Sequence, residues 1–283
     1  MSRLTRLTPW AALLPFLLFL LVFLVVPTLT VVVGAFRDDS GFTLDNIRAL
    51  FETTTLTVLW KSLLLSAVSS VIGAVFGGFL AYLVVTRPAT SVFRRVVTAI
   101  SGVLAQFGGV PLAFAFIATL GFSGVLTQAA SDAFGINLFG SGWLYGIPGL
   151  ILVYSYFQIP LMVIVFLPAL DGIRPQWREA AVNLGASTRQ YWTRIAGPML
   201  LPAFLGATLL LFANAFAAYA TAAVLVSQGN PILPLFIRTA LTSEVILGRQ
   251  NLAFALAFEM IVVVAILMTA YSLLVRRTSR WLQ

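Results

Sequence analysis

Six long apolar runs constrain this chain more than any other feature of its sequence. They cover residues 11–36, 62–85, 96–120, 146–170, 201–226 and 254–275. A helix of about 20 apolar residues crosses the roughly 30 Å hydrocarbon core of a bilayer. The 283-residue chain is 60% hydrophobic and 9% charged, which leaves no room for a sizeable soluble domain. We therefore predict an all-α polytopic membrane protein, a single domain over residues 1–283 with six transmembrane helices.

The distribution of basic residues predicts the orientation of these helices. With the N-terminus inside the cell, twelve of the 17 Arg and Lys residues fall on the cytoplasmic side. Positively charged connections stay in the cytoplasm, so we expect both termini and residues 171–200 there. The net charge of +8 then reflects topology, and we expect no nucleic-acid partner. The first run follows Arg3 and Arg6, but it is long and lacks a small-x-small cleavage site, so we expect a retained anchor.

The residue types that carry most enzyme chemistry are missing. The chain has no His and no Cys, and Lys61 is its only lysine. Nucleophilic and general-base schemes built on His or Cys are therefore excluded, and the sequence around Lys61 cannot form a Gly-Lys-Ser/Thr nucleotide-binding loop. We expect a non-enzymatic chain with no metal site and no cofactor of its own, which does not hydrolyse ATP itself.

Residues 171–200 form a polar, signal-rich stretch between two apolar runs. Pro175 suits the first turn of a helix, because its missing N–H costs nothing there. One apolar face then follows at positions i, i+3, i+4 and i+7, made of Trp177, Ala180, Ala181 and Leu184. Gly185 is expected to end this helix in the left-handed conformation that glycine adopts readily.

A second short helix is expected directly after that glycine. Ser187 followed by Gln190 matches a capping box, in which each residue's side chain bonds the other's backbone N–H. The helix would carry Tyr191 and Ile195 on one side, and Gly197-Pro198 would end it. The pattern predicts a compact helix-turn-helix. An ordinary amphipathic loop resting on the membrane surface is the alternative interpretation.

The same stretch resembles a known family motif. Glu-Ala-Ala, three residues, Gly, nine residues, then Ile-x-Leu-Pro is the EAA motif of the membrane subunits of bacterial binding-protein-dependent ABC importers. This chain departs from it at Gly197, where the family usually has Leu, and matches it at Glu179, Ala180, Ala181, Gly185, Ile195 and Pro198. The resemblance implies a type I ABC importer permease fold in the bacterial inner membrane, with a cytoplasmic coupling helix between helices four and five.

The resemblance also implies partners and residue roles. A coupling helix docks on a separate subunit, so two cytoplasmic ATP-binding subunits are expected, and they would bind ATP and Mg. A second similar permease or a second copy of this chain, an extracytoplasmic substrate-binding protein and membrane lipid complete the expected set. Glu179 would anchor the docking helix and Gly185 would supply its turn, while Trp177, Ala181, Leu184 and Tyr191 would fill the groove. The full set of expected coupling residues is Trp177, Glu179, Ala180, Ala181, Leu184, Gly185, Tyr191 and Ile195.

One face of the second apolar run carries small residues at spacings of three and four. They are Ser62, Ser66, Ser69, Ser70, Gly73 and Gly77. Small side chains let two membrane helices approach closely. We therefore predict that this face packs against another helix, without a functional role for any single hydroxyl group.

Polar side chains at membrane depth are candidates for the substrate pathway. They are Gln106, Tyr154, Gln158, Asn214, Tyr219 and Glu259. Gly108, Gly109 and Pro160 mark expected kinks near the two glutamines, as a gated cavity requires. A carboxylate in lipid is costly and by default faces a cavity, so Glu259 would favour a cationic substrate. The alternative is hydrogen bonding between packed helices or, for Glu259, pairing with a neighbour such as Arg249.

Two later segments indicate a class of substrate. Residues 214–225 and 231–241 are similar to permeases of the polyamine (spermidine/putrescine) group, whose relatives also move ferric iron, thiamine and phosphonates. Together with Glu259, this resemblance favours a polyamine. Two other classes stay open. An ion-coupled secondary transporter would need more buried ionisable groups and an internal repeat, and a membrane scaffold would use residues 171–200 only to bind a partner.

Overall fold

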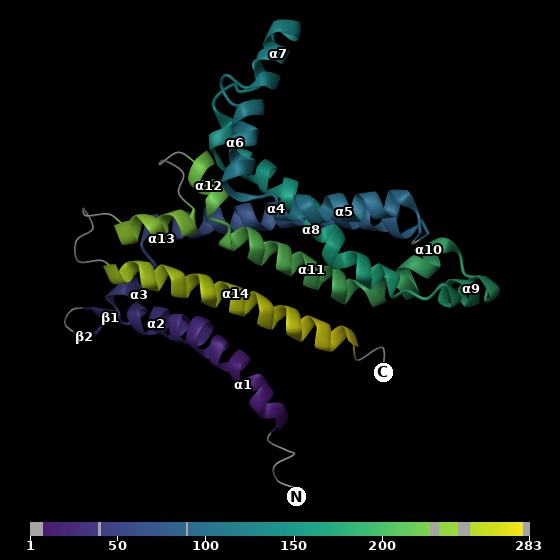
Figure 1. The fold of residues 1–283 in the computed structure, drawn as a ribbon, viewed down its shortest axis with the longest axis horizontal. Coiled ribbons are helices and arrows are strands. Elements are labelled where there is room, and N and C mark those ends of the chain that lie inside the picture. The colour runs from purple at the N-terminus through teal and green to yellow at the C-terminus, as the bar shows by residue number, and fades with distance from the viewer. Residues whose placement is uncertain (1–7, 39–40, 89, 227–231, 243–249, 280–283) are drawn as a thin grey trace, which may run out of the picture. The chain divides into compact units, whose positions relative to one another are not determined.

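The computed structural model describes residues 8–38, 41–88, 90–226, 232–242 and 250–279. Arg3, Arg6 and Arg249 lie outside the described residues. Within these ranges the regular structure is helical apart from one short hairpin, and it divides into two compact units (Figure 1). The smaller unit contains Met1–Leu56 and Phe236–Val263, and the larger unit contains Thr57–Leu235 and Val264–Gln283.

The smaller unit is built from one long apolar helix, a hairpin and the start of α14 (Gln250–Ser279). The long helix comprises α1 (Thr8–Leu20), a π-helical turn (Leu21–Val25) and α2 (Val26–Ala35). The antiparallel strands β1 (Arg37–Asp38) and β2 (Gly41–Phe42) follow, and then α3 (Asp45–Ala49). Phe258 packs edge to face on Phe36 with 5.5 Å between ring centroids. A Cβ atom on Gly34 would lie 2.7 Å from the Phe254 ring, so α2 and α14 pack closely here.

The larger unit is organised around α8, which packs against α5, α6 and α11 and is the most buried of the candidate membrane spans. The helices of this unit and of its boundary are α4 (Thr53–Val85), α5 (Val92–Gln106), α6 (Gly109–Leu120), α7 (Val125–Phe134), η3 (Trp143–Tyr145), α8 (Ile147–Asp171), α9 (Pro175–Asn183), α10 (Thr188–Tyr191), η4 (Trp192–Ala196), α11 (Gly197–Ala217), α12 (Ala220–Leu225) and α13 (Leu233–Thr242). In Figure 1, α9 and α10 lie at one end of this unit, and α12 lies towards the other end.

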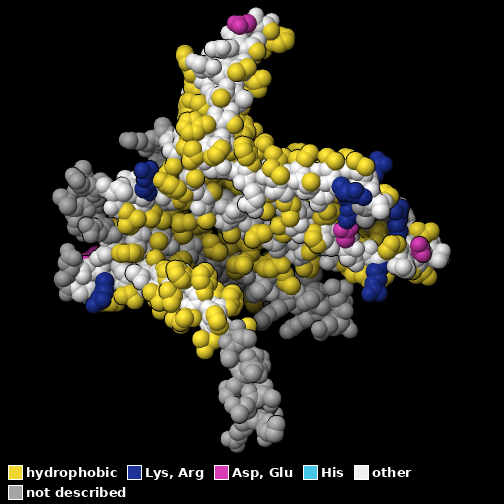
Figure 2. Space-filling model, viewed as in Figure 1, with side chains coloured by type: hydrophobic (Ala, Val, Ile, Leu, Met, Phe, Trp, Pro, Cys, Tyr) yellow, Lys and Arg dark blue, Asp and Glu magenta, His cyan; other side chains and the backbone are white. Residues whose placement is uncertain are grey.

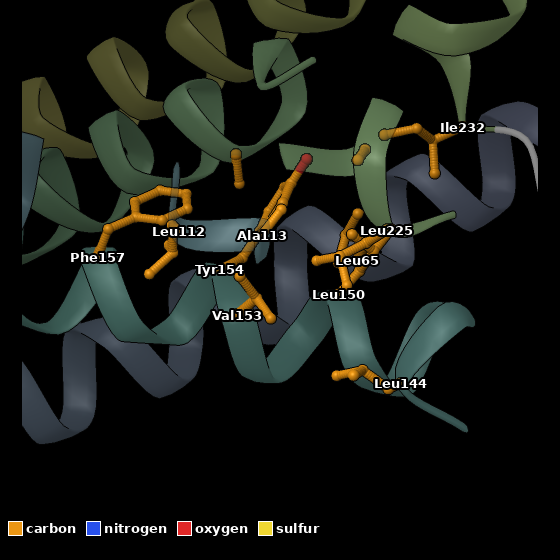
Figure 3. Packing of buried hydrophobic residues seen from close by; sticks show 12 residues of the cluster. Leu65, Leu112, Ala113, Leu144, Leu150, Val153, Tyr154, Phe157, Leu225 and Ile232 are labelled. Carbon is orange, nitrogen blue, oxygen red and sulfur yellow. The ribbon is translucent and has the colours of Figure 1, made fainter. Parts of the chain in front are cut away.

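A hydrophobic core joins α4, α6, α8 and α12 of the larger unit (Figure 3). Leu150 of α8 lies beside Leu65 of α4 and Leu225 of α12, and all three are buried. Tyr154, one helical turn further along α8, is also fully buried. The hydrophobic runs read from the sequence therefore supply contacts between helices as well as an apolar surface.

The small-residue face of α4 packs against α8, which confirms the prediction made from its spacing. A Cβ atom on Gly77 would lie 2.4 Å from the Ile159 carbonyl oxygen, and one on Gly73 would lie 2.7 Å from Cβ of Gln158. The four serines of this face are buried and donate hydrogen bonds to carbonyls within α4. Their hydroxyl groups are thus satisfied locally while the small side chains allow the close approach.

Six helices in the described part of the chain are long and apolar enough to cross a membrane, as predicted. They are Leu13–Ala35, Thr53–Val85, Gly109–Phe134, Ile147–Asp171, Thr188–Ala217 and Asn251–Val275. The third and fifth differ from the expected spans of 96–120 and 201–226, because the chain breaks inside both. The first break falls between Gln106 and Gly109, where Gly109 has a φ of 73°, and the second lies at the extended residue Ala218.

Candidate functional site

The segment from Pro175 to Ala196, here called the coupling segment, is held at the end of α8. Arg94 of α5 donates a hydrogen bond to Asp171, the last residue of α8, and forms an ion pair with it. Arg174 is extended, and Pro175 then opens α9, as predicted. The coupling segment therefore begins close to a contact between α5 and the end of α8.

The joint of the coupling segment is a complete Schellman motif. Gly185 has a φ of 77°, in the left-handed region. The Gly185 N–H donates to the Val182 carbonyl at 2.9 Å, and the Ala186 N–H donates to the Ala181 carbonyl at 2.9 Å. Both bonds satisfy carbonyls that a helix end would otherwise leave free. The predicted left-handed glycine cap is confirmed.

The restart of the helix is also confirmed. The Gln190 N–H donates to the Ser187 hydroxyl oxygen at 3.3 Å, and the Ser187 N–H donates to the Gln190 side-chain oxygen at 2.8 Å, which completes the predicted capping box. The predicted end at Gly197-Pro198 is wrong. The π-helical turn η4 continues the helix into α11, and its wide ring carries a bond from the Gly197 N–H to the Trp192 carbonyl. Pro198 follows this π-helical turn directly, and an irregular turn of this kind accommodates a proline inside a continuous helix.

The coupling segment has an inward face and an outward face. Ala181 and Tyr191 are 4% and 6% exposed and pack in one cluster with Ala196. Leu184 is 86% exposed, while Glu179, Ala180 and Val182 are also exposed. Ala181 and Tyr191, expected to fill a partner's groove, therefore pack inside this chain instead. Trp177 and Ile195 are half-buried.

Val182 belongs to the outward face, and the sequence analysis missed it. Helical spacing assigned Leu184 to the same face as Ala181, but α9 ends at Asn183 and Leu184 is only its cap. The chain turns at Leu184, so its side chain leaves the inward face. A helix that ends at a glycine cap departs from helical geometry there. This signal could have shown that Leu184 and Ala181 lie on different faces.

A cavity of about 280 Å³ lies where the two broken helices meet. Gln106, Asn214 and Tyr219, three of the expected pathway residues, line it together, along with backbone at Gly108 and Gly109. Its side-chain polar groups are amides and hydroxyls, and no Asp, Glu, Lys or Arg is among its lining residues. The arrangement offers neutral hydrogen-bond donors and acceptors beside freed backbone groups.

Hydrogen bonds between distant residues hold the two breaks together. The Gly109 N–H donates to the Thr221 hydroxyl oxygen at 2.9 Å, and that hydroxyl group lies 3.3 Å from the Gly109 carbonyl oxygen, to which it donates. The Tyr154 hydroxyl donates to the Ala218 carbonyl oxygen at 2.8 Å. Tyr154 thus binds the backbone freed at the second break. Thr221 was not among the predicted site residues.

The other three expected pathway residues, Tyr154, Gln158 and Glu259, are not among the residues that line this cavity. Gln158 is fully buried and donates from Nε2 to the Ser69 hydroxyl oxygen at 2.9 Å, a contact between α8 and α4. Glu259 belongs to α14 in the smaller unit. One oxygen of each side chain, Gln158 Oε1 and Glu259 Oε2, is buried without a hydrogen-bond partner in the described part of the chain. Their roles in a pathway stay predictions.

The fold and the coupling segment together define a class of protein: a multi-pass helical membrane protein with a helix-turn-helix where its fourth span is followed by its fifth. Residues 73–280 match the family described as binding-protein-dependent transport system inner membrane component, and the chain belongs to that family. No group of three His, Cys, Asp or Glu residues that could hold a metal ion occurs among the residues with described positions.

Several relatives carry the names of transport systems. The chain is 28% identical over 217 residues to the putative ferric transport system permease protein FbpB 1 of Haemophilus influenzae, covering 76% of this chain and 34% of the relative. It is 26% identical over 265 residues to the spermidine/putrescine permease protein PotB of the same organism, covering 89% and 88%. The chain spans about a third of the length of the ferric permease that it matches. Similarity does not single out the polyamine group.

A solved structure shares the fold. A bacterial ABC transporter that imports the acidic polysaccharide alginate superimposes with a TM-score of 0.78 at 21% identity, over 95% of each chain. The predicted type I ABC importer permease fold is confirmed by this likeness. At this level of identity the likeness shows the fold alone.

Proposed function

We propose that this chain is the membrane-spanning permease subunit of an ATP-driven importer in the bacterial inner membrane. It forms the pathway for a small solute delivered by an extracytoplasmic binding protein. Two cytoplasmic ATP-binding subunits and a second permease, similar or identical, complete the importer. Family membership supports this proposal, and so does the name of one structural neighbour, an alginate transporter in complex with a periplasmic protein that binds an alginate pentasaccharide.

The exposed outward face of the coupling segment is the observation that carries the proposal. Leu184 and Val182 are apolar and largely exposed beside the Glu179 carboxylate, on a joint that is fully hydrogen-bonded. An apolar centre with a charged neighbour suits a protein interface. In the proposed mechanism, this face docks on an ATP-binding subunit, and closure of the two ATP-binding subunits carries α9 with it.

The broken helices near Gly109 and Ala218 supply the proposed gate. Their freed backbone groups bond to side chains across the cavity, so the two breaks move as linked parts. Alternating exchange of these bonds would open the pathway to one side and then the other. Gln106, Asn214 and Tyr219 would offer the solute neutral hydrogen bonds during passage.

For the solute, we propose a cation, with a polyamine as the first candidate. Glu259 has a buried carboxylate oxygen with no hydrogen-bond partner among the described residues, and a cationic solute would satisfy it. Ferric iron is the second candidate, because two relatives at 27% and 28% identity are named as ferric permeases. Thiamine, also a cation, follows these two. A phosphonate is an anion, so its transport would contradict the proposed charge of the solute.

The test is ATPase activity of the reconstituted complex with its own ATP-binding subunits and binding protein. The panel contains polyamines, ferric iron, thiamine and a phosphonate. Stimulation by one ligand-loaded binding protein supports the importer and identifies the solute. Solute uptake that follows an ion gradient without any coupling to ATP would contradict the proposal and favour a secondary transporter.

The Glu259→Gln variant tests the charge of the solute. The amide keeps the shape of the side chain and removes its charge, so uptake of a cation should fall while co-purification of the ATP-binding subunits stays unchanged. Uptake is measured over a range of solute concentrations. Unchanged uptake at every concentration would remove Glu259 from the pathway.

A further inference from the structure

A second cavity lies beneath the coupling segment, within the larger unit. It measures about 270 Å³. The ends of α4 and α8 line one part of it, and α9, α10 and η4 line the rest. This volume lies just below the roughly 300–1,000 Å³ of typical ligand pockets. It therefore suits a compact polar group better than a large organic molecule.

The hydrogen-bond donors that line this cavity include Arg178, Thr188 and Tyr191 of the coupling segment. The Tyr191 side chain is 6% exposed, and its hydroxyl group, which is not among the fully buried unpaired atoms, makes no hydrogen bond with any described residue. Arg178 is exposed and forms no ion pair within the described residues. No Asp or Glu lines the cavity. A guanidinium and two hydroxyl groups without a carboxylate favour an anion with several acceptor oxygens.

The remaining walls are aromatic and apolar. Tyr82 lies edge to face on Trp192 with 5.4 Å between ring centroids, and Tyr191 lies 5.8 Å from Trp192. Tyr and Trp gather where membrane meets water, because their rings are apolar and their tips are polar. This ring cluster is therefore suited to the headgroup level of a bilayer.

Further arginines lie at the same end of the larger unit as this cavity. Figure 2 shows a group of dark blue side chains where α9 and α10 lie in Figure 1. Arg174, Arg189 and Arg194 are all exposed in this region. Basic side chains close to a membrane attract the anionic lipids of the cytoplasmic leaflet, and basic pockets between membrane helices bind their headgroups.

We propose that this cavity binds the phosphate of an anionic phospholipid, with Arg178, Thr188 and Tyr191 as its ligands. The lipid source rests on the proposed function, because the topology of an importer permease places this end of the unit at the cytoplasmic leaflet. A phosphate bound here bridges the coupling segment to the ends of α4 and α8. The lipid thus stabilises the seat of the segment that docks on the ATP-binding subunit.

The experiment is native mass spectrometry of the full chain in its assembled complex, titrated with phosphatidylglycerol or with phosphatidylcholine of the same acyl chains. We expect one tightly retained phosphatidylglycerol per copy of this chain and no matching phosphatidylcholine. Arg178→Gln should weaken retention by roughly tenfold or more, the scale of one lost hydrogen bond to a charged group. Tyr191→Phe keeps the ring, removes the hydroxyl and should weaken retention less. Arg238→Gln, an exposed arginine on α13 that does not line the cavity, is the matched control and should bind as the unmodified chain does.

Three outcomes would overturn the proposal. They are equal retention of the two lipids, equal retention by Arg178→Gln and Arg238→Gln, and displacement of phosphatidylglycerol by millimolar inorganic phosphate, which would indicate a soluble anion as the ligand. The measurement of lipid retention does not depend on transport activity. A complex that binds the lipid through Arg178 but shows no ATP-coupled uptake would leave this site standing and remove the importer proposal.

Discussion

The coupling segment and the cavity between the broken helices are two joints in the same unit, and they are built in opposite ways. The coupling joint at Gly185 is closed by bonds between residues at most five positions apart. The cavity joint is closed by a pair 112 positions apart, Gly109 and Thr221. A locally closed joint keeps its shape while it moves as a body, whereas a joint between distant segments opens when those segments separate.

Under the proposed function, this difference suggests separate parts for the two joints in transport. The coupling segment would act as a rigid body that transmits force through its exposed outward face. The cavity joint would act as the gate, because its hydrogen bonds exist only while α6 and α12 stay together. Mutations at the first joint should therefore uncouple ATP use from transport, and mutations at the second should change the gate itself.

Reversing the charge at Glu179 should give the largest effect. Glu179→Lys places a cation on the docking surface, where like charges or an unpaired buried charge cost several kcal/mol. We expect loss of transport and loss of the ATP-binding subunits on purification, with the chain still inserted in the membrane. Asp132→Lys, an equally exposed reversal on α7, is the control and should keep both. Full uptake with normal co-purification in Glu179→Lys would contradict the docking role.

Removing the Thr221 hydroxyl should weaken the gate by an intermediate amount. Thr221→Val leaves the Gly109 N–H without its acceptor, at a cost of about 1–3 kcal/mol. We expect a lower unfolding temperature of the purified complex and ATP hydrolysis that no longer depends on the loaded binding protein. Thr208→Val in α11 loses only a bond to its own helix and is the matched control. Equal behaviour of the two variants would mean that the Gly109 contact does not hold the gate.

A side chain at Gly185 should have the smallest effect. Gly185→Ala forces an L-residue into the left-handed region, at a cost of about 1–2 kcal/mol. No atom lies within 4 Å of the added Cβ, so strain in the backbone is the whole effect. ATPase coupling should weaken in Gly185→Ala and weaken less in Gly185→Asn, because Asn tolerates this conformation. The ratio of transport to ATP hydrolysis measures the difference, and an equal ratio in both variants would contradict a strain effect.

The contrast between local and long-range hydrogen bonds also explains which features could be predicted from the sequence. The six spans, the glycine cap and the capping box depend on residues close in sequence, and the predictions of all three are confirmed. Local spacing failed at Leu184 and Gly197, where the chain leaves ideal α-helical geometry at a cap and at a π-helical turn. The spacing of residues in the sequence indicates helical periodicity, but it does not indicate how the chain turns at the end of a helix.

The cavity could be predicted only in part. The sequence singled out Gln106, Asn214 and Tyr219 as polar groups at membrane depth, and the structure places all three on one cavity. It did not indicate Thr221, because a threonine in an apolar run has no local feature that reveals a partner 112 positions away. Whether Glu259 serves the pathway depends on contacts that no spacing in the sequence encodes.

Single introduced thiols test the central claim most directly, since the chain has no Cys. Leu184→Cys, Ala181→Cys and Asp132→Cys would each be labelled with a short maleimide–benzophenone reagent, whose photoactivated ketone inserts into C–H bonds of a contacting subunit, in the assembled complex. We predict an adduct with the ATP-binding subunit from Leu184→Cys alone, because Ala181 is buried and Asp132 lies on α7, away from the coupling segment in the chain. No adduct from Leu184→Cys, or an equal one from Asp132→Cys, would contradict docking through the outward face.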